Sequence, residues 1–159
     1  MVNDGAMFKS ICGFFAVAAV LLSVSTASVW GQSMKEKSLY DRLGGKNAIT
    51  AVVDEFVSRV AADGRINAFF AQTASDKKRL AGFKMKLVDQ ICEASGGPCK
   101  YKGKDMKTAH MGMGIGSGDF DALVQDLVGA LDIFSVGAHE KDQLLAALGP
   151  MKTDIVDKR

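Results

Sequence analysis

The sequence is poor in the side chains from which most metal and nucleophile sites are built. Its 159 residues include only two histidines, His110 and His139, and three cysteines. It contains no HExxH motif, no recognisable Ser-His-Asp signature and no phosphate-cradling glycine loop. A hydrolytic metal centre usually takes three or more ligands from His, Cys and acidic residues. Because no such cluster is present, nothing supports a metallohydrolase or a phosphate-binding enzyme.

The chain also lacks a strong net charge. Its 20 basic and 18 acidic residues give a formal net charge of +2, without a dense basic stripe. Nucleic-acid binding depends on clustered Lys and Arg that neutralise phosphates, so no nucleic-acid partner is expected. The composition, 48% hydrophobic and 24% charged, is that of an ordinary globular protein. A chain of this length is expected to form one domain with a sizeable core.

Prolines are rare, and no stretch alternates with the two-residue period of a half-buried strand. Beyond residue 38, apolar residues recur at helical spacing, which predicts an all-α fold. The expected helices are 47–62, 75–95 with Ser75 as its cap, 120–134, and a last one kinked at Gly149-Pro150. Between them lie a short turn-like element at 39–43, a short segment at 65–70 that ends in two aromatics, and a short segment around His110.

The first residues have the three-part pattern of a secretory signal peptide. Lys9 precedes an uncharged apolar run at 11–24, which is followed by small residues at 25–28. The pattern predicts a signal peptide at 1–27, a short linker at 28–37 and one domain at 38–159, with cleavage after Gly31 as a second option. We therefore expect an exported, periplasmic protein with no membrane contact in its mature form. An uncleaved membrane anchor is the alternative, although the run is short for a bilayer.

Two cysteines remain once Cys12 leaves with the signal peptide. Cys92 and Cys99 flank Gly96-Gly97-Pro98, a sequence that can turn the chain back on itself. An even number of cysteines in an oxidising compartment predicts a disulfide. The alternative is that Cys92 is simply a buried small apolar residue.

Several short motifs, in their order and spacing, resemble the group I truncated haemoglobins from residue 38 to about 157. They are 39–45 (LYDRLGG), Phe56, Phe69-Phe70, Gly96-Gly97-Pro98, Tyr101 and 106–110 (MKTAH). The resemblance implies a truncated globin, a sandwich of two helices over two around one haem b and its iron. A porphyrin supplies four nitrogens, so one axial histidine is sufficient. No CxxCH motif is present, so the haem would be held without thioether bonds.

The resemblance also implies roles for individual residues. His110 corresponds to the proximal ligand of the iron, and Phe70 to the phenylalanine that packs on the haem face. Phe83 and Leu87 fall on distal positions of the long helix. The remaining implied haem contacts are Phe56 as a pocket aromatic, Lys86 beside a propionate and Tyr101 at the haem edge. His139 matches no ligand and is interpreted as a surface residue.

The chain departs from the family pattern on the distal side. Many members have a tyrosine and a glutamine that donate hydrogen bonds to oxygen, where this chain has Val57 and Leu87. Loss of one charge-assisted hydrogen bond costs an oxygen complex about 1.5–3 kcal/mol. We therefore expect an apolar distal pocket with weak preference for oxygen. Gln90, one turn beyond Leu87, is an alternative donor if the helix is rotated.

Two functions follow from the resemblance. The first is reversible binding of a diatomic gas, O₂, CO or NO, at the iron. The alternative is an exported haem redox protein, for electron transfer or for consuming NO or peroxide, served by a reductase or electron-transfer partner. A desolvated Lys86 amine is then the candidate sixth ligand. The remaining interpretation is a helical protein that binds no haem.

Overall fold

The computed structural model describes residues 36–157, and these form helices and turns without any strand. The expected signal peptide at 1–27 and nearly all of the linker at 28–37 lie outside the described residues. No helix within the described part has the length and apolarity needed to cross a membrane. The elements are α1 (Leu39–Arg42), α2 (Gly45–Ala62), the 3-10 turn η1 (Asn67–Phe70), α3 (Ala71–Ala74), α4 (Lys77–Ala94), α5 (Met106–His110), α6 (Ser117–Ile133), α7 (Ala138–Leu148), the 3-10 turn η2 (Gly149–Met151) and α8 (Lys152–Ile155).

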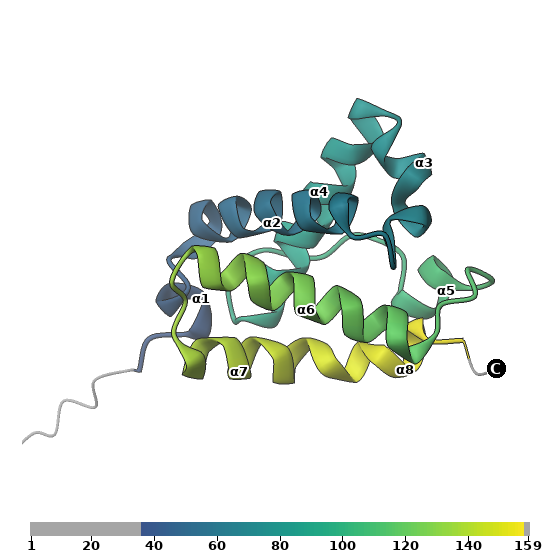
Figure 1. Cartoon of the computed structure of the whole chain (residues 1–159). Helices are drawn as coiled ribbons and strands as arrows, with labels where there is room; N and C mark the ends of the chain where they lie inside the picture. The colour runs from purple at the N-terminus through teal and green to yellow at the C-terminus, as the bar shows by residue number, and fades with distance from the viewer. Residues whose placement is uncertain (1–35, 158–159) are drawn as a thin grey trace, which may run out of the picture. The chain divides into compact units, whose positions relative to one another are not determined.

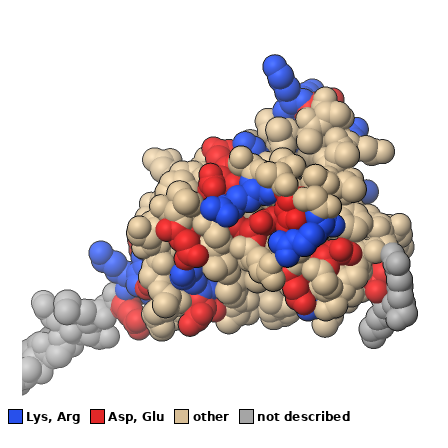
Figure 2. All heavy atoms as spheres, in the orientation of Figure 1, with Lys and Arg blue, Asp and Glu red and all other residues tan. Residues whose placement is uncertain are grey.

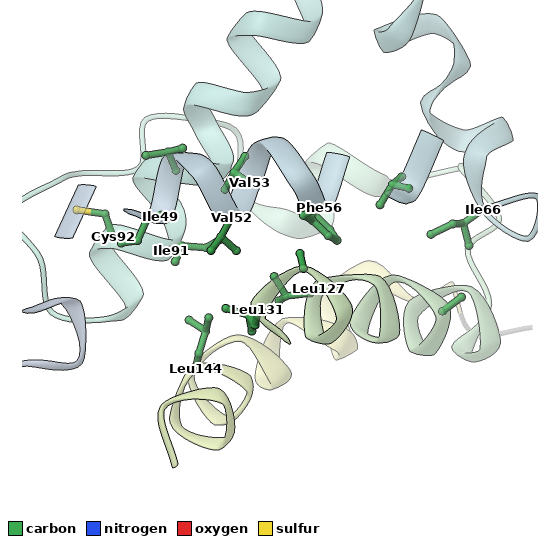
Figure 3. Close-up of a cluster of buried hydrophobic side chains, with 14 residues drawn as sticks. Ile49, Val52, Val53, Phe56, Ile66, Ile91, Cys92, Leu127, Leu131 and Leu144 are labelled. Atoms are coloured by element: carbon green, nitrogen blue, oxygen red, sulfur yellow. The ribbon is translucent and has the colours of Figure 1, made fainter. Parts of the chain in front are cut away.

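Helix α2 is the centre of the fold. Its buried residues Ile49, Val52, Val53, Phe56 and Val60 follow helical spacing, so that they share one face. That face packs against both α4 and α6, and Figure 3 shows its side chains above Leu127 and Leu131 of α6. Each fully buried apolar side chain of this size stabilises the fold by about 1.5–3 kcal/mol. The layer of α2 and α4 over α6 and α7 confirms the expected two-over-two sandwich (Figure 1).

The predicted start of helix α4 was wrong by one residue. Asp76 is the N-terminal cap, because its carboxylate accepts a hydrogen bond from the Arg79 backbone N–H. The Ser75 hydroxyl instead donates to the Gln72 carbonyl at the end of α3. Asp and Ser are comparably good caps, so the structure of the preceding turn decides which one is used.

The end of α4 is held by the turn that the glycines and proline predict. Gly96 has φ +82°, a conformation that costs glycine little, and the Gly97 N–H donates to the Cys92 carbonyl at 2.7 Å. The Cys92–Cys99 disulfide is present, with Cα atoms 5.7 Å apart, which confirms that prediction. A Cβ on Gly97 would meet the Tyr40 ring and the Cys92 sulfur. This close packing joins α4 firmly to the segment that leads to α5.

The C-terminal helices support the remaining short elements. Gly149 and Pro150 form the 3-10 turn η2 between α7 and α8, as the predicted kink requires. Helix α8 contacts α5, and Figure 1 shows α5, α8 and the start of α6 at the end of the domain that also carries α3. These contacts place the segment that contains His110 on a folded support.

Candidate haem site

An apolar cavity of about 380 Å³ lies between α2, η1, α3 and the first half of α4. Its walls are mostly aliphatic and aromatic, with two polar side chains. The lining residues are Val57, Val60, Ala61, Asn67, Ala68, Phe70, Ala71, Thr73, Ala74, Leu80 and Phe83. Ligand sites are typically apolar concavities with a few polar groups, and this cavity has that character.

Three of the residues predicted to contact haem meet in this cavity. Val57 comes from α2, Phe70 from the end of η1 and Phe83 from α4. The Phe70 and Phe83 rings are tilted by 51°, with centroids 5.8 Å apart. All three side chains are only half buried, although they are apolar. They therefore present apolar surface that a bound group can cover.

Phe56 and Leu87 are not among the residues that line the cavity. Phe56 is 6% exposed and belongs to the hydrophobic core, where it points toward α6 (Figure 3). Successive helical residues are about 100° apart, so the backbone that turns Val57 toward the cavity turns Phe56 into the core. Leu87 is half buried and packs against the core cluster.

His110 is the last residue of α5, and one of its ring nitrogens has a fixed partner. Its Nδ1 lies 2.7 Å from the Met106 carbonyl oxygen. A carbonyl oxygen only accepts hydrogen bonds, so Nδ1 carries a proton, and in the neutral imidazole Nε2 is then the nitrogen with the lone pair. Metal-ligating histidines are commonly oriented by this kind of bond from the other nitrogen. The ring is half buried, and its Nε2 has the chemistry of an axial ligand.

Tyr101 lies in the segment between α4 and α5. Its backbone N–H donates to Glu93 Oε2 at 2.9 Å, and its hydroxyl donates to the Lys104 carbonyl oxygen. The first of these bonds, followed by the Lys100 ammonium, holds the pKa of Glu93 below its usual value. Burial, and then the charge of Asp105, raises the pKa of the Tyr101 phenol. Tyr101 is thus fixed to α4 in its neutral form.

The other polar residues singled out in the sequence lie outside the cavity lining. Lys86 is exposed on α4. The Gln90 amide donates to Met151 Sδ at 3.0 Å and to Met106 Sδ at 3.6 Å. It therefore points toward η2 and α5, and it is not among the residues that line the cavity. His139 is exposed near the start of α7, as its interpretation as a surface residue requires.

The alanine-rich wall of the cavity was missed in the sequence. Ala68, Ala71 and Ala74 are three residues apart, so η1 and α3 present small side chains on one face. This three-residue spacing of alanines is the feature of the sequence from which the wall could have been predicted. Small residues there leave room between α2 and α4, and this room is the cavity.

The residues present fit a haem in two independent respects. Half-buried apolar side chains surround a cavity beside the long helix, and a histidine with a free Nε2 stands on α5. A porphyrin needs apolar walls for its faces and a single nitrogen for its iron. The donor set is thus the one that a haem requires.

Comparisons with known proteins agree with this geometry. The family model of bacterial-like globins matches residues 38–157. The chain is 36% identical to the group 1 truncated hemoglobin GlbN of Mycolicibacterium paratuberculosis, over 74% of this chain and 83% of that protein. It is 34% identical to GlbN of a Nostoc species, over 76% of this chain and 98% of that protein.

Solved structures give the same result. The truncated hemoglobin of Tetrahymena pyriformis in its Fe(III) form has a TM-score of 0.69 and 30% identity, over 77% of this chain and all of that one. The 2/2 hemoglobin of a Synechococcus species, solved in the cyanomet state with covalently attached heme, gives the same TM-score, identity and coverage of both chains. These relationships confirm haem b as the cofactor expected from the sequence. This chain belongs to the bacterial-like globin family.

Proposed function

We propose that the protein binds a diatomic gas reversibly, at a haem iron held by His110 Nε2. The observation that carries the proposal is the 2.7 Å contact between His110 Nδ1 and the Met106 carbonyl, which leaves Nε2 as a nitrogen ligand. When bound, haem supplies a metal that coordinates O₂, CO or NO. His110 belongs to α5, and α5 rests on α8, so the ligand is supported by packing as well as by its hydrogen bond.

The chain's own side chains make the wall of the cavity apolar, and His110 is not among the residues that line this cavity. Val57, Phe70 and Phe83 carry no hydrogen-bond donor in their side chains, and all three line the cavity. The two polar residues of the lining, Asn67 and Thr73, belong to η1 and α3. A gas ligand next to Val57 is therefore expected to be held with little polar assistance, which favours CO relative to O₂.

Two histidine variants test the assignment. His110→Ala is expected to lose most of its haem, because the iron would lose the imidazole nitrogen proposed to hold it. His139→Ala is the matched control, since that side chain is exposed on α7. Haem content and absorption spectra of the ferric, ferrous and CO-bound forms are the readouts. Unchanged haem content and spectra in His110→Ala would refute the assignment, and imidazole should restore the spectrum if it is right.

The same spectra test the redox alternative. A sixth ligand from the chain would give a six-coordinate ferric or ferrous spectrum without added gas. Lys86, the candidate for that role, is exposed and forms no ion pair within the described residues. A five-coordinate ferrous spectrum that Lys86→Met leaves unchanged would favour gas binding.

We also propose that the protein acts outside the cytoplasm. Two observations support this: the signal-peptide pattern around Lys9, and the Cys92–Cys99 disulfide. Disulfides persist mainly in oxidising compartments such as the bacterial periplasm. The N-terminal sequence of the mature protein is the direct test of this proposal.

A further inference from the structure

The charges of this nearly neutral protein are unevenly distributed. The described residues contain 16 basic and 17 acidic side chains. The segment 76–110, from the cap of α4 to His110, has nine bases and four acids, a balance of +5. The rest of the described chain has seven bases and 13 acids, a balance of −6. Positive charge therefore predominates in the segment that carries Phe83 and His110.

The bases of segment 76–110 also differ from the others in their pairing. Outside this segment, six of the seven bases form ion pairs, for example Arg42 with Glu140. Figure 2 shows acidic and basic groups intermixed on the face of α2 and α6. Within the segment, only Lys84 and Lys100 are paired among the described residues. Seven bases are thus left without an ion pair.

Helical spacing and the contacts of α4 place two of these bases on one surface. Arg79, Lys86, Gln90 and Glu93 follow helical spacing, so they share one face of α4. Gln90 contacts Met106 of α5, and Glu93 binds the Tyr101 backbone. This face therefore turns toward α5 and the segment that precedes it.

That preceding segment adds further positive charge. Lys102, Lys104 and Lys107 are exposed. Lys107 precedes His110 by three residues on α5, and its charge helps to lower the pKa of Asp105, after the hydrogen bonds from Thr108. We call Arg79, Lys86, Lys102, Lys104 and Lys107 the basic rim. From Arg79 to Glu93 this surface extends about 20 Å along α4.

An exposed apolar side chain stands next to the rim. Met111 directly follows His110 and is 74% exposed. Apolar contact beside complementary charge is characteristic of protein–protein interfaces, where the charges mainly govern encounter and orientation. Unpaired positive charges repel one another, so an acidic partner would stabilise the rim.

We propose that the basic rim is the docking surface of an acidic electron-donor protein that reduces the haem iron. The inference rests on the proposed function, because it needs the iron at His110. One electron passes from a reduced iron–sulfur or flavin protein to ferric iron. The donor is oxidised by one electron and the iron becomes ferrous. Docking at the rim brings the donor to the part of the surface nearest the proposed ligand.

The expected effect follows from Coulomb's law. At 6–10 Å in water, one charge pair changes the encounter rate roughly two- to threefold. Three lysines should thus contribute about tenfold at low salt, and the effect should largely vanish at about 0.5 M salt because of screening.

The experiment measures reduction of the ferric holoprotein by reduced plant-type ferredoxin, an acidic iron–sulfur protein, in a stopped-flow instrument. The triple variant is Lys102→Gln, Lys104→Gln and Lys107→Gln. The matched control is Lys37→Gln, Lys46→Gln and Lys141→Gln, which removes the same charge from residues outside segment 76–110. Uncharged lumiflavin semiquinone serves as a reductant that needs no docking. Sedimentation with phosphatidylglycerol vesicles tests a membrane as the occupant.

About tenfold slower, less salt-dependent reduction by ferredoxin in the rim variant, with the control within twofold of wild type, would support the proposal. Equal rates in rim variant and wild type would overturn it. Rim-dependent binding to vesicles together with unchanged ferredoxin rates would also overturn it, in favour of a membrane. In all of these cases lumiflavin still reduces the iron. A wild-type protein without a haem spectrum would instead overturn the proposed function as well.

Discussion

Val57→Tyr would place a hydrogen-bond donor in the apolar cavity. Val57 is half buried on α2 and shares the cavity with Phe70 and Phe83. The cavity of about 380 Å³ gives a larger ring room to enter without displacing the core. The neighbouring Phe56, which does pack in the core, is untouched by the change. The phenol hydroxyl is then expected to donate to an oxygen ligand in the cavity.

The size of the effect follows from the single bond that is added. A hydrogen bond to a group with partial negative charge contributes about 1.4–3 kcal/mol. Each 1.4 kcal/mol corresponds to a factor of about ten. Oxygen dissociation from Val57→Tyr should therefore be about ten- to a hundredfold slower than from wild type. CO, which is less polar, should change much less.

Stopped-flow displacement of oxygen by CO gives the dissociation rate directly. Val57→Phe is the matched control, because it adds the same ring without the hydroxyl. Equal oxygen rates in the tyrosine and phenylalanine variants would refute the reasoning. Slow release from wild type that Gln90→Leu or Asn67→Leu accelerates would show that a donor already serves the ligand.

The remaining predictions concern stability, redox state and processing. Asp126 has a buried carboxylate oxygen with no hydrogen-bond partner within the described chain, and burial, then Asp63, raises its pKa despite nearby arginines. The native state thus binds this proton more tightly than the unfolded state, and stability falls as pH rises between the two pKa values. Asp126→Asn should raise the Tm at neutral pH by the equivalent of about 1 kcal/mol, and this gain should shrink on acidification. The control Asp142→Asn, at an exposed residue of α7, should leave the Tm unchanged. A difference in Tm that does not depend on pH, measured by calorimetry, would contradict the prediction. Thiol titration of unfolded, unreduced mature protein should find no free thiol, because Cys92 and Cys99 are bonded, and two thiols would rule the bond out. Intact mass of periplasmic protein should correspond to a chain that starts at Ser28, and full-length protein confined to the cytoplasm would rule out export.

Much of the fold is predictable because local signals are strong. The apolar period of α2 and the glycine–proline turn after α4 each depend on neighbours in sequence, and the structure confirms both. The ends of a helix are harder to predict where two neighbouring residues can each serve as its cap. Asp76 rather than Ser75 caps α4, because Ser75 is used by the turn of α3. That choice depends on contacts that a helical period does not encode.

The site was predictable in its residue types but not in its geometry. The motif around His110 indicated an axial ligand, whereas the bond that fixes its tautomer appears only in the structure. The excess of basic residues in segment 76–110 was not predicted, because the sequence has a net charge near zero and no dense basic stripe. The ion pairs that neutralise the other bases join residues far apart in sequence, such as Arg42 and Glu140. Only the fold reveals which bases remain unpaired.

Helix α4 shows why a core stripe and a cofactor pocket look alike in sequence. Leu80, Phe83, Leu87 and Ile91 form one apolar stripe, yet only Ile91 is buried and the other three are half buried. The second half of α4 packs in the core and is tied by the Cys92 disulfide, while Leu80 and Phe83 line the cavity. Apolar surface left half exposed weakens the folded state relative to full burial. A haem that covers this apolar surface restores the lost free energy of burial, and it stabilises the folded chain because it binds only that state. The same stripe of α4 therefore contributes both to the core and to the cofactor site.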